Sequence, residues 1–204
     1  HATGAATPFV HRPALTIEAF GDIPRAFLLD GGWLPDDLRD AYASVSEAAM
    51  AGVRRAFARA GHVAQLRIHG DVHAGNVLWS IGNVGAGPHF VDFDDARTGP
   101  AAQDLWMLLS GERESMEHQL RKVLEGYEQF RAFDRGELHL IEALRTLRLL
   151  HYSAWIAQRW NDPAFPAAFP WFDTQRYWQD RILELREQIP LMDEAPLDVG
   201  RYRN

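Results

Sequence analysis

The sequence contains no cysteine, and Lys122 is the single lysine among its 21 lysine and arginine residues. The lack of cysteine excludes disulfide bonds, zinc–thiolate sites and cysteine nucleophiles. No apolar run reaches the roughly 18–20 residues that span a bilayer. The formal net charge of −7 argues against nucleic-acid and anionic-membrane partners, which favour basic surfaces. We therefore expect neither partner, and we expect a monomer in the cytoplasm.

The rest of the composition is typical of a globular protein. Hydrophobic residues make up 47% of the 204 positions and charged residues 24%, which is enough apolar material for a sizeable core. The chain begins at His1 without an initiator methionine, and no signal peptide opens it. We therefore expect it to be one piece of a larger polypeptide.

Hydrophobic periodicity predicts a mostly helical chain with a few short strands. Residues 1–35 are rich in Gly and Pro and are expected to be irregular, with at most short pieces of structure. Helices are expected over residues 35–60, with a possible break at Gly52, and over 101–111, 114–133, 136–160 and 174–189. Strands are expected over residues 63–70, 76–80 and 89–93, the last two forming a hairpin around a turn at 82–87. Residues 161–172 are expected to form a Pro-rich loop.

Polar side chains are concentrated on both sides of the expected hairpin. The stretch RIHGDVHAGN, residues 67–76, contains Asp71 and ends in Asn76, and VDFDD, residues 91–95, contains Asp92. Asn76 begins one strand and Asp92 ends its partner, and antiparallel neighbours lie only about 5 Å apart. We therefore expect the three side chains to converge at one end of the hairpin.

These residue types suit a magnesium-dependent reaction. The Asp92 carboxylate is a hard anionic ligand and Asn76 offers a neutral carbonyl oxygen, a combination that suits Mg²⁺ shared with substrate phosphates. Asp71, if it stays off the metal, can accept the proton of an attacking hydroxyl. Such an arrangement can perform phosphoryl transfer by positioning and charge neutralisation.

Other readings of the same residues remain open at this point. His69, Asp71 and His73 alternate, so in a strand they would share a face and could bind Zn²⁺ or Fe. Against this, His69 is expected to be a buried, hydrogen-bonding residue. Asp94 and Asp95 could bind a second Mg²⁺ or a cationic substrate, or they could be solvated carboxylates that pair with Arg97.

HGDVHAGN followed by VDFDD resembles the catalytic loop and metal-binding segment of the aminoglycoside phosphotransferase and choline kinase group, which has the protein-kinase-like fold. The resemblance implies that Asp71 is the catalytic base and that ATP is the phosphoryl donor. It implies that Asn76 is a Mg²⁺ ligand and that Asp92 is the principal one. It also implies that His69 orients the loop and that Asp104 hydrogen-bonds the loop backbone.

The resemblance covers the C-terminal lobe of such enzymes. It implies that residues 1–204 form this lobe, with the catalytic loop at 67–76, the metal segment at 91–95 and a helical remainder at 100–190. The expected fold is therefore mostly α, a helical lobe with a small β-hairpin that carries the catalytic and metal-binding residues. Kinases also use a glycine-rich loop and a strand lysine to hold ATP phosphates, and neither occurs in this chain. The nucleotide-binding N-terminal lobe is thus expected to be absent from it.

Three functions remain possible from the sequence. The surrounding residues resemble a bacterial serine/threonine protein kinase with a stress-response role, which favours a Ser/Thr acceptor on a protein. The alternative acceptor is a cationic small molecule such as an aminosugar or amino alcohol. The third possibility is a non-catalytic, kinase-like binding module.

Overall fold

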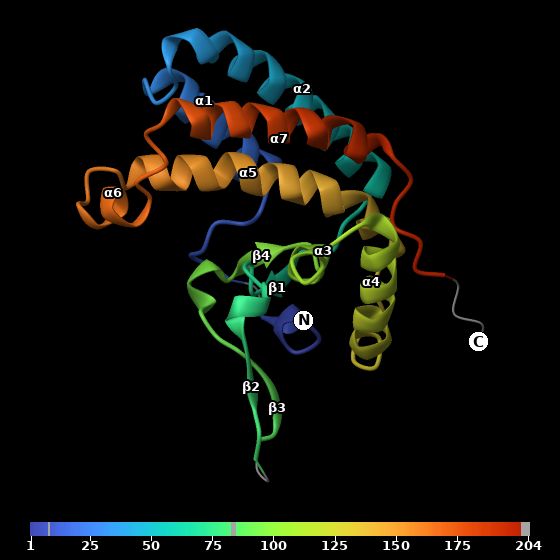
Figure 1. Ribbon diagram of the computed structural model, residues 1–204. Coiled ribbons are helices and arrows are strands. Elements are labelled where there is room, and N and C mark those ends of the chain that lie inside the picture. The colour runs from blue at the N-terminus through green and yellow to red at the C-terminus, as the bar shows by residue number, and fades with distance from the viewer. Residues whose placement is uncertain (8, 83–84, 201–204) are drawn as a thin grey trace. The chain divides into compact units, whose positions relative to one another are not determined.

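The computed structural model describes residues 1–7, 9–82 and 85–200, and most of them are helical (Figure 1). The chain divides into two compact parts. The first, here the mixed unit, contains residues 1–15, 62–141 and the segment from residue 195 onward. The second, here the helical unit, contains residues 16–61 and 142–194. The prediction of a mostly helical chain with a small β-hairpin is confirmed.

Long helices build the helical unit, in which α2 and α7 run side by side (Figure 1). Its helices are α1 (Ile23–Asp30), α2 (Asp36–Ala60), most of α5 (Ile141–Gln158), α6 (Ala164–Ala168) and α7 (Gln175–Asp193). Helix α2 begins with two aspartates, which favour the positive end of the helix dipole, and ends at Gly61 with φ +71°. Helix α2 runs unbroken through Gly52. A Cβ at Gly52 would come within 2.6 Å of Met192 Cε, so the glycine permits close packing between α2 and α7.

Aromatic and aliphatic side chains fill the core between these helices. Tyr42 and Trp178 are both almost completely buried, and their rings meet edge to face with centroids 5.7 Å apart. Leu185 on α7 is equally buried, whereas Leu183 on the same helix is half exposed. The helical unit therefore owes its stability to one apolar stripe on each long helix.

Two separate two-stranded sheets form the framework of the mixed unit. Strand β1 (Leu66–Ile68) pairs antiparallel with β4 (Arg97–Gly99), and β2 (Val77–Ser80) pairs antiparallel with β3 (Gly87–Phe90). Helices α3 (Ala102–Trp106) and α4 (Arg113–Tyr127) and the 3₁₀ helix η5 (Arg135–Leu140) follow β4. The β1–β4 pair and the base of the β2–β3 hairpin together frame residues 69–76 and 91–96.

The structure differs from the predicted elements at several places. Helix α1 lies within the segment expected to be irregular, and α6 lies within the expected Pro-rich loop. Strand β4 was not predicted. The hairpin strand expected at 89–93 is wrong in its bounds, because β3 ends at Phe90 and Asp92 has φ 62°, which a strand residue cannot adopt. Positions 83 and 84 of the expected turn lie outside the described residues. Within the described part of the chain, no helix combines the length and apolar character needed to cross a membrane.

Candidate active site

The loop after β1 is held by the carboxylate of Asp104 on α3. The backbone N–H of His69 donates to Asp104 Oδ2 at 2.7 Å, and the N–H of Gly70 donates to Oδ1 at 2.8 Å. Asp104 is only 8% exposed, and this burial raises its pKa, while the two N–H donors oppose the rise. The predicted role of Asp104, hydrogen bonding to the loop backbone, is confirmed.

Gly70 is required where the loop passes the segment after β3. Its φ is +88°, a conformation that side-chain-bearing residues rarely adopt, and a Cβ there would collide with the backbone carbonyl of Asp95. The Gly70 carbonyl accepts a hydrogen bond of 3.0 Å from Gln103 Nε2, whose own Oε1 accepts from Trp106 Nε1. The two loops therefore lie in direct backbone contact at this glycine.

His69 links the two loops through both nitrogens of its ring. Nε2 lies 2.8 Å from the carbonyl oxygen of Val91, and Nδ1 lies 3.3 Å from the backbone N–H of Asp71. A carbonyl can only accept and an N–H can only donate, so Nε2 carries the proton and Nδ1 accepts. His69 is buried and uses both nitrogens internally, which confirms the predicted hydrogen-bonding role and argues against a metal-ligand role.

Asp71 and Asn76 are brought into contact, as their spacing predicted. Asn76 Nδ2 donates to the Asp71 carbonyl at 3.0 Å and to Asp71 Oδ2 at 3.3 Å. His73 precedes the short 3₁₀ turn η3 (Ala74–Asn76), and its Nδ1 accepts from the N–H of Gly75 at 3.0 Å. His73 Nε2 lies 3.5 Å from Asp71 Oδ2. The loop thus orients the Asp71 carboxylate from two sides while leaving its side chain 17% exposed.

Asp92 lies at the base of the β2–β3 hairpin, next to a backbone hydrogen bond that joins the loop at 69–76 to the loop at 91–96. The N–H of Val91 donates to the Asn76 carbonyl at 3.1 Å, and Asp92 is the next residue. It is exposed and left-handed, with φ 62° and ψ 68°, and it precedes the 3₁₀ turn η4 (Phe93–Asp95). The structure thus brings Asp92 to the same end of the hairpin as Asn76, and its role as a metal ligand stays a prediction.

The other acidic and histidine residues do not gather into a second site. Asp95 pairs with Arg97, whose Nη2 donates to Asp95 Oδ1 at 2.5 Å and whose Nε donates to the Asp95 carbonyl at 2.7 Å. Over residues 1–7, 9–82 and 85–200, no group of three or more His, Asp or Glu side chains is arranged to hold a metal ion. The alternative of a transition-metal site at His69, Asp71 and His73 is therefore not supported.

The contacts of His1 could not be predicted from the sequence. Its Nε2 lies 2.9 Å from Asp104 Oδ2, and its Nδ1 lies 3.0 Å from the hydroxyl of Tyr127 on α4. The His1 side chain is 10% exposed. His1 therefore adds a third polar contact to the carboxylate that anchors the loop, across 103 positions of sequence.

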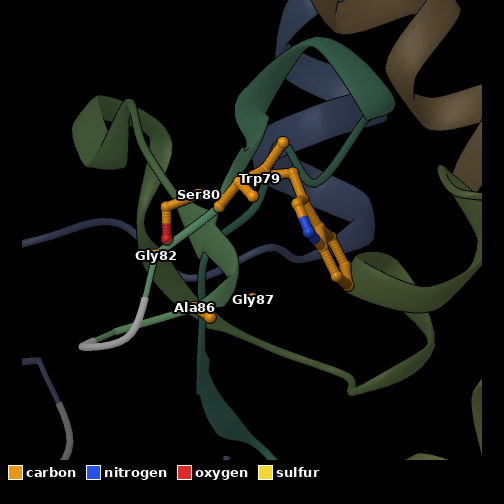
Figure 2. Close-up of a pocket in the computed structure, with 6 residues that line it drawn as sticks. Trp79, Ser80, Gly82, Ala86 and Gly87 are labelled. Carbon is orange, nitrogen blue, oxygen red and sulfur yellow. The ribbon is translucent and has the colours of Figure 1, made fainter.

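A separate hollow lies at the opposite end of the hairpin from Asn76. Figure 2 shows it in close-up, with Trp79, Ser80, Gly82, Ala86 and Gly87 labelled. Trp79 is 71% exposed, and none of the predicted catalytic or metal-binding residues lines this hollow. It is therefore a poor candidate for the reaction site.

Residues 1–141, which include every residue of the candidate site, match the phosphotransferase enzyme family. The chain belongs to this family. It is 42% identical over 199 residues to stress response kinase A of Escherichia coli K12 and 41% identical to the serine/threonine protein kinase RdoA of Salmonella typhimurium LT2. Each alignment covers 98% of this chain and 58% of the relative, so the chain spans less than two thirds of their length.

Solved structures of the phosphotransferase type share the fold. A choline/ethanolamine kinase family protein from Mesorhizobium loti aligns with a TM-score of 0.59 over 94% of this chain and 61% of its own. A microcompartment-associated aminopropanol kinase aligns with a TM-score of 0.54 over 89% of this chain and 53% of its own. Both are 18% identical to this chain, so they show the fold alone. The resemblance found in the sequence is confirmed by these matches.

Proposed function

We propose that this chain is the catalytic part of an ATP- and Mg²⁺-dependent kinase that phosphorylates Ser or Thr hydroxyls of proteins. The observation that carries the proposal is the contact between Asp71 and Asn76 on a loop whose backbone is fixed by Asp104. The identity of 42% to stress response kinase A and the name of RdoA support the protein acceptor and a stress-response role. The proposal includes action as a monomer in the cytoplasm.

In this proposal Asp71 is the general base. The Asp71 side chain is 17% exposed, so a substrate hydroxyl can approach it, and Asn76 Nδ2 orients Oδ2. The carboxylate would accept the proton of the attacking hydroxyl as the hydroxyl oxygen bonds to the γ-phosphorus of ATP and the bond from that phosphorus to the bridging oxygen breaks, which releases ADP. The nearby His73 ring lies 3.5 Å from the same oxygen and helps to keep the carboxylate in place.

The donor set at the hairpin base fits magnesium. Asn76 contacts Asp71 through the nitrogen end of its amide, so the oxygen end is the one that can coordinate a cation. Asp92 is exposed and adds an anionic oxygen, and oxygen donors are what Mg²⁺ prefers. Asn76 and Asp92 would hold the ion, which when bound neutralises charge on the substrate phosphates.

We propose that residues 1–204 correspond to the C-terminal lobe and that the nucleotide-binding lobe belongs to another part of the full polypeptide. The 58% coverage of the relatives supports this division. Lys122 also supports it, because it is exposed on α4 and pairs with Glu125 at 3.0 Å. A lysine in that position is not suited to hold ATP phosphates, so the phosphate-binding lysine would come from elsewhere.

The test is phosphoryl transfer from radiolabelled ATP by the full-length polypeptide to a generic basic protein. Asp71→Asn is expected to lower the rate by about 10²-fold or more, the range typical for loss of general-base catalysis. Asp92→Ala is also expected to lower the rate strongly, because it removes a proposed magnesium ligand. Asp134→Asn is the matched control, because Asp134 is a carboxylate of the same unit that serves an exposed turn. Unchanged rates in both Asp71→Asn and Asp92→Ala would refute the residue assignment.

A small-molecule acceptor is the second candidate. The choline/ethanolamine kinase family protein and the aminopropanol kinase share the fold, and their names point to small amino alcohols. A panel of amino alcohols and aminosugars, assayed beside the basic protein, separates the two acceptors. Saturable turnover of one small molecule without protein labelling favours this candidate, and absence of both ATP binding and turnover favours a non-catalytic binding module.

A further inference from the structure

Arg12 reaches from the N-terminal segment of the mixed unit to the loop that carries Asp92. Its Nη1 donates to the carbonyl oxygens of Asp94 at 2.5 Å and of Ala96 at 3.0 Å, with a longer contact of 3.4 Å to that of Phe93. These carbonyls belong to the 3₁₀ turn η4 and its C-cap. A cation at the C-terminal end of a helical turn satisfies carbonyls that lack a partner within the turn.

The backbone just before this turn needs such support. Asp92 is the single non-glycine residue with positive φ over residues 1–7, 9–82 and 85–200. A left-handed conformation is costly for a residue with a side chain, and it persists only where the surrounding structure imposes it. The contacts that fix the turn after Asp92 therefore also fix the direction of the Asp92 carboxylate.

Those contacts come from several directions. Arg97 binds the carbonyl and the carboxylate of Asp95, and Gly70 packs against the same carbonyl. Arg12 approaches from a segment that is itself anchored, since the N–H of Leu15 donates to the Thr98 carbonyl of β4 at 2.7 Å. Arg12 is thus the most distant in sequence of these contacts, 80 positions from Asp92.

We propose that Arg12 is a positioning residue that holds Asp92 in the conformation required to bind a divalent cation. The inference rests on the proposed function, in which Asp92 is a magnesium ligand. Arg12 would contact neither the cation nor the substrate, and it would act only through the carbonyls of η4. Its loss should therefore loosen the loop in the metal-free protein as well as weaken cation binding.

The test uses two readouts that do not depend on catalysis. The first is hydrogen–deuterium exchange of the backbone amides at 92–97 in the metal-free protein. The second is the affinity of the full-length polypeptide for Mn²⁺ with ATP, followed by electron paramagnetic resonance. Arg12→Gln is expected to raise the exchange rates and to weaken Mn²⁺ binding, each by about three- to tenfold, the size expected for the loss of a hydrogen bond at an exposed position.

Two further variants make the result specific. Arg12→Lys keeps the charge, but its ammonium lies one bond closer to the backbone than Nη1, which makes all three contacts, so its values should fall between those of the parent protein and Arg12→Gln. Arg113→Gln is the matched control, because Arg113 also donates to backbone carbonyls, those of Ala195 and Pro196, but in the C-terminal segment. It should change neither readout. If Arg12→Gln lowers the melting temperature by more than a few degrees, the exchange rates and Mn²⁺ affinity of Arg12→Lys are compared with those of the parent protein instead.

The outcomes separate this inference from the function on which it rests. If Asp92→Ala weakens Mn²⁺ binding but neither Arg12 variant changes binding or exchange, the role of Arg12 is refuted and the metal assignment stands. If Asp92→Ala leaves Mn²⁺ binding unchanged, the metal assignment fails, and the inference about Arg12 fails with it. Faster exchange together with weaker Mn²⁺ binding in the Arg12 variants, and unchanged values in Arg113→Gln, would support the inference.

Discussion

Replacing Asp104 by Asn should destabilise the catalytic loop far more than the loss of one charge at a surface would. Both carboxylate oxygens accept backbone N–H bonds, at 2.7 Å from His69 and 2.8 Å from Gly70, in a buried position. An asparagine keeps one acceptor but turns its NH₂ group toward the other N–H. One charge-assisted bond becomes neutral, at a cost of about 1 kcal/mol, and one buried donor loses its acceptor, at about 1–3 kcal/mol. We expect the free energy of unfolding to fall by about 2–4 kcal/mol.

Urea unfolding of the 204-residue chain, followed by circular dichroism at neutral pH, measures this change. The control is Asp134→Asn, since Asp134 also accepts a backbone N–H, from Gly136 at 2.8 Å, but in an exposed turn. Water can replace that acceptor, so the control should lose about 0.5 kcal/mol or less. An Asp104→Asn variant that loses no more stability than the control would refute the view that Asp104 anchors the loop.

Three further predictions concern packing, backbone conformation and pH. Gly70→Ala should lower the free energy of unfolding by about 2–3 kcal/mol, because the alanine would be strained in the left-handed conformation and would collide with the neighbouring loop. Gly61→Ala is the control: Gly61 has φ +71° but open space around it, so this change should cost about 1 kcal/mol. Calorimetric melting of both variants checks the difference. Leu185→Ala should cost about 2–5 kcal/mol because Leu185 is 1% exposed, and Leu183→Ala on the same helix, 50% exposed, should cost well under about 1 kcal/mol in urea unfolding. Burial raises the pKa of the Glu137 carboxyl above its ordinary 4.5, so the folded state binds the carboxyl proton more tightly than the unfolded state does. The free energy of unfolding should therefore fall as the pH rises from about 4.5 through the raised pKa. In Glu137→Gln this part of the pH dependence should disappear.

The sequence was sufficient to predict elements with a long, regular pattern and the contact between Asp71 and Asn76. Helix α2 was predicted to within one residue, because 25 positions of periodic apolar residues are framed by aspartates and a glycine. Only four residues of loop separate Asp71 from Asn76, and their side chains, which were predicted to converge at one end of the hairpin, are in contact. Local spacing decides such contacts.

The elements that sequence reasoning missed are short or depend on distant partners. Strand β4 has only three residues, and 28 residues of chain separate it from its partner β1, so it has no pattern of its own. Helix α1 continues the π-helical segment Glu18–Asp22 in a Gly- and Pro-rich part of the chain, and an isolated helical run of about 13 residues is only marginally stable in water. The left-handed backbone of Asp92 was equally hidden, because VDF reads as a continuing strand. In each case tertiary contacts, not local preference, select the conformation.

The dependence of the short elements on distant contacts also affects how the candidate site works. The residues proposed to be catalytic and metal-binding lie on loops between three- and four-residue strands, and such loops have little conformational preference of their own. Their geometry must therefore be imposed by hydrogen bonds from elsewhere in the chain, chiefly from Asp104 and Arg12. Each of these bonds contributes only about 1–3 kcal/mol, so either can be weakened while the helical unit stays folded. The chemistry of the site should consequently be more sensitive to Asp104 and Arg12 than the melting temperature of the whole protein is.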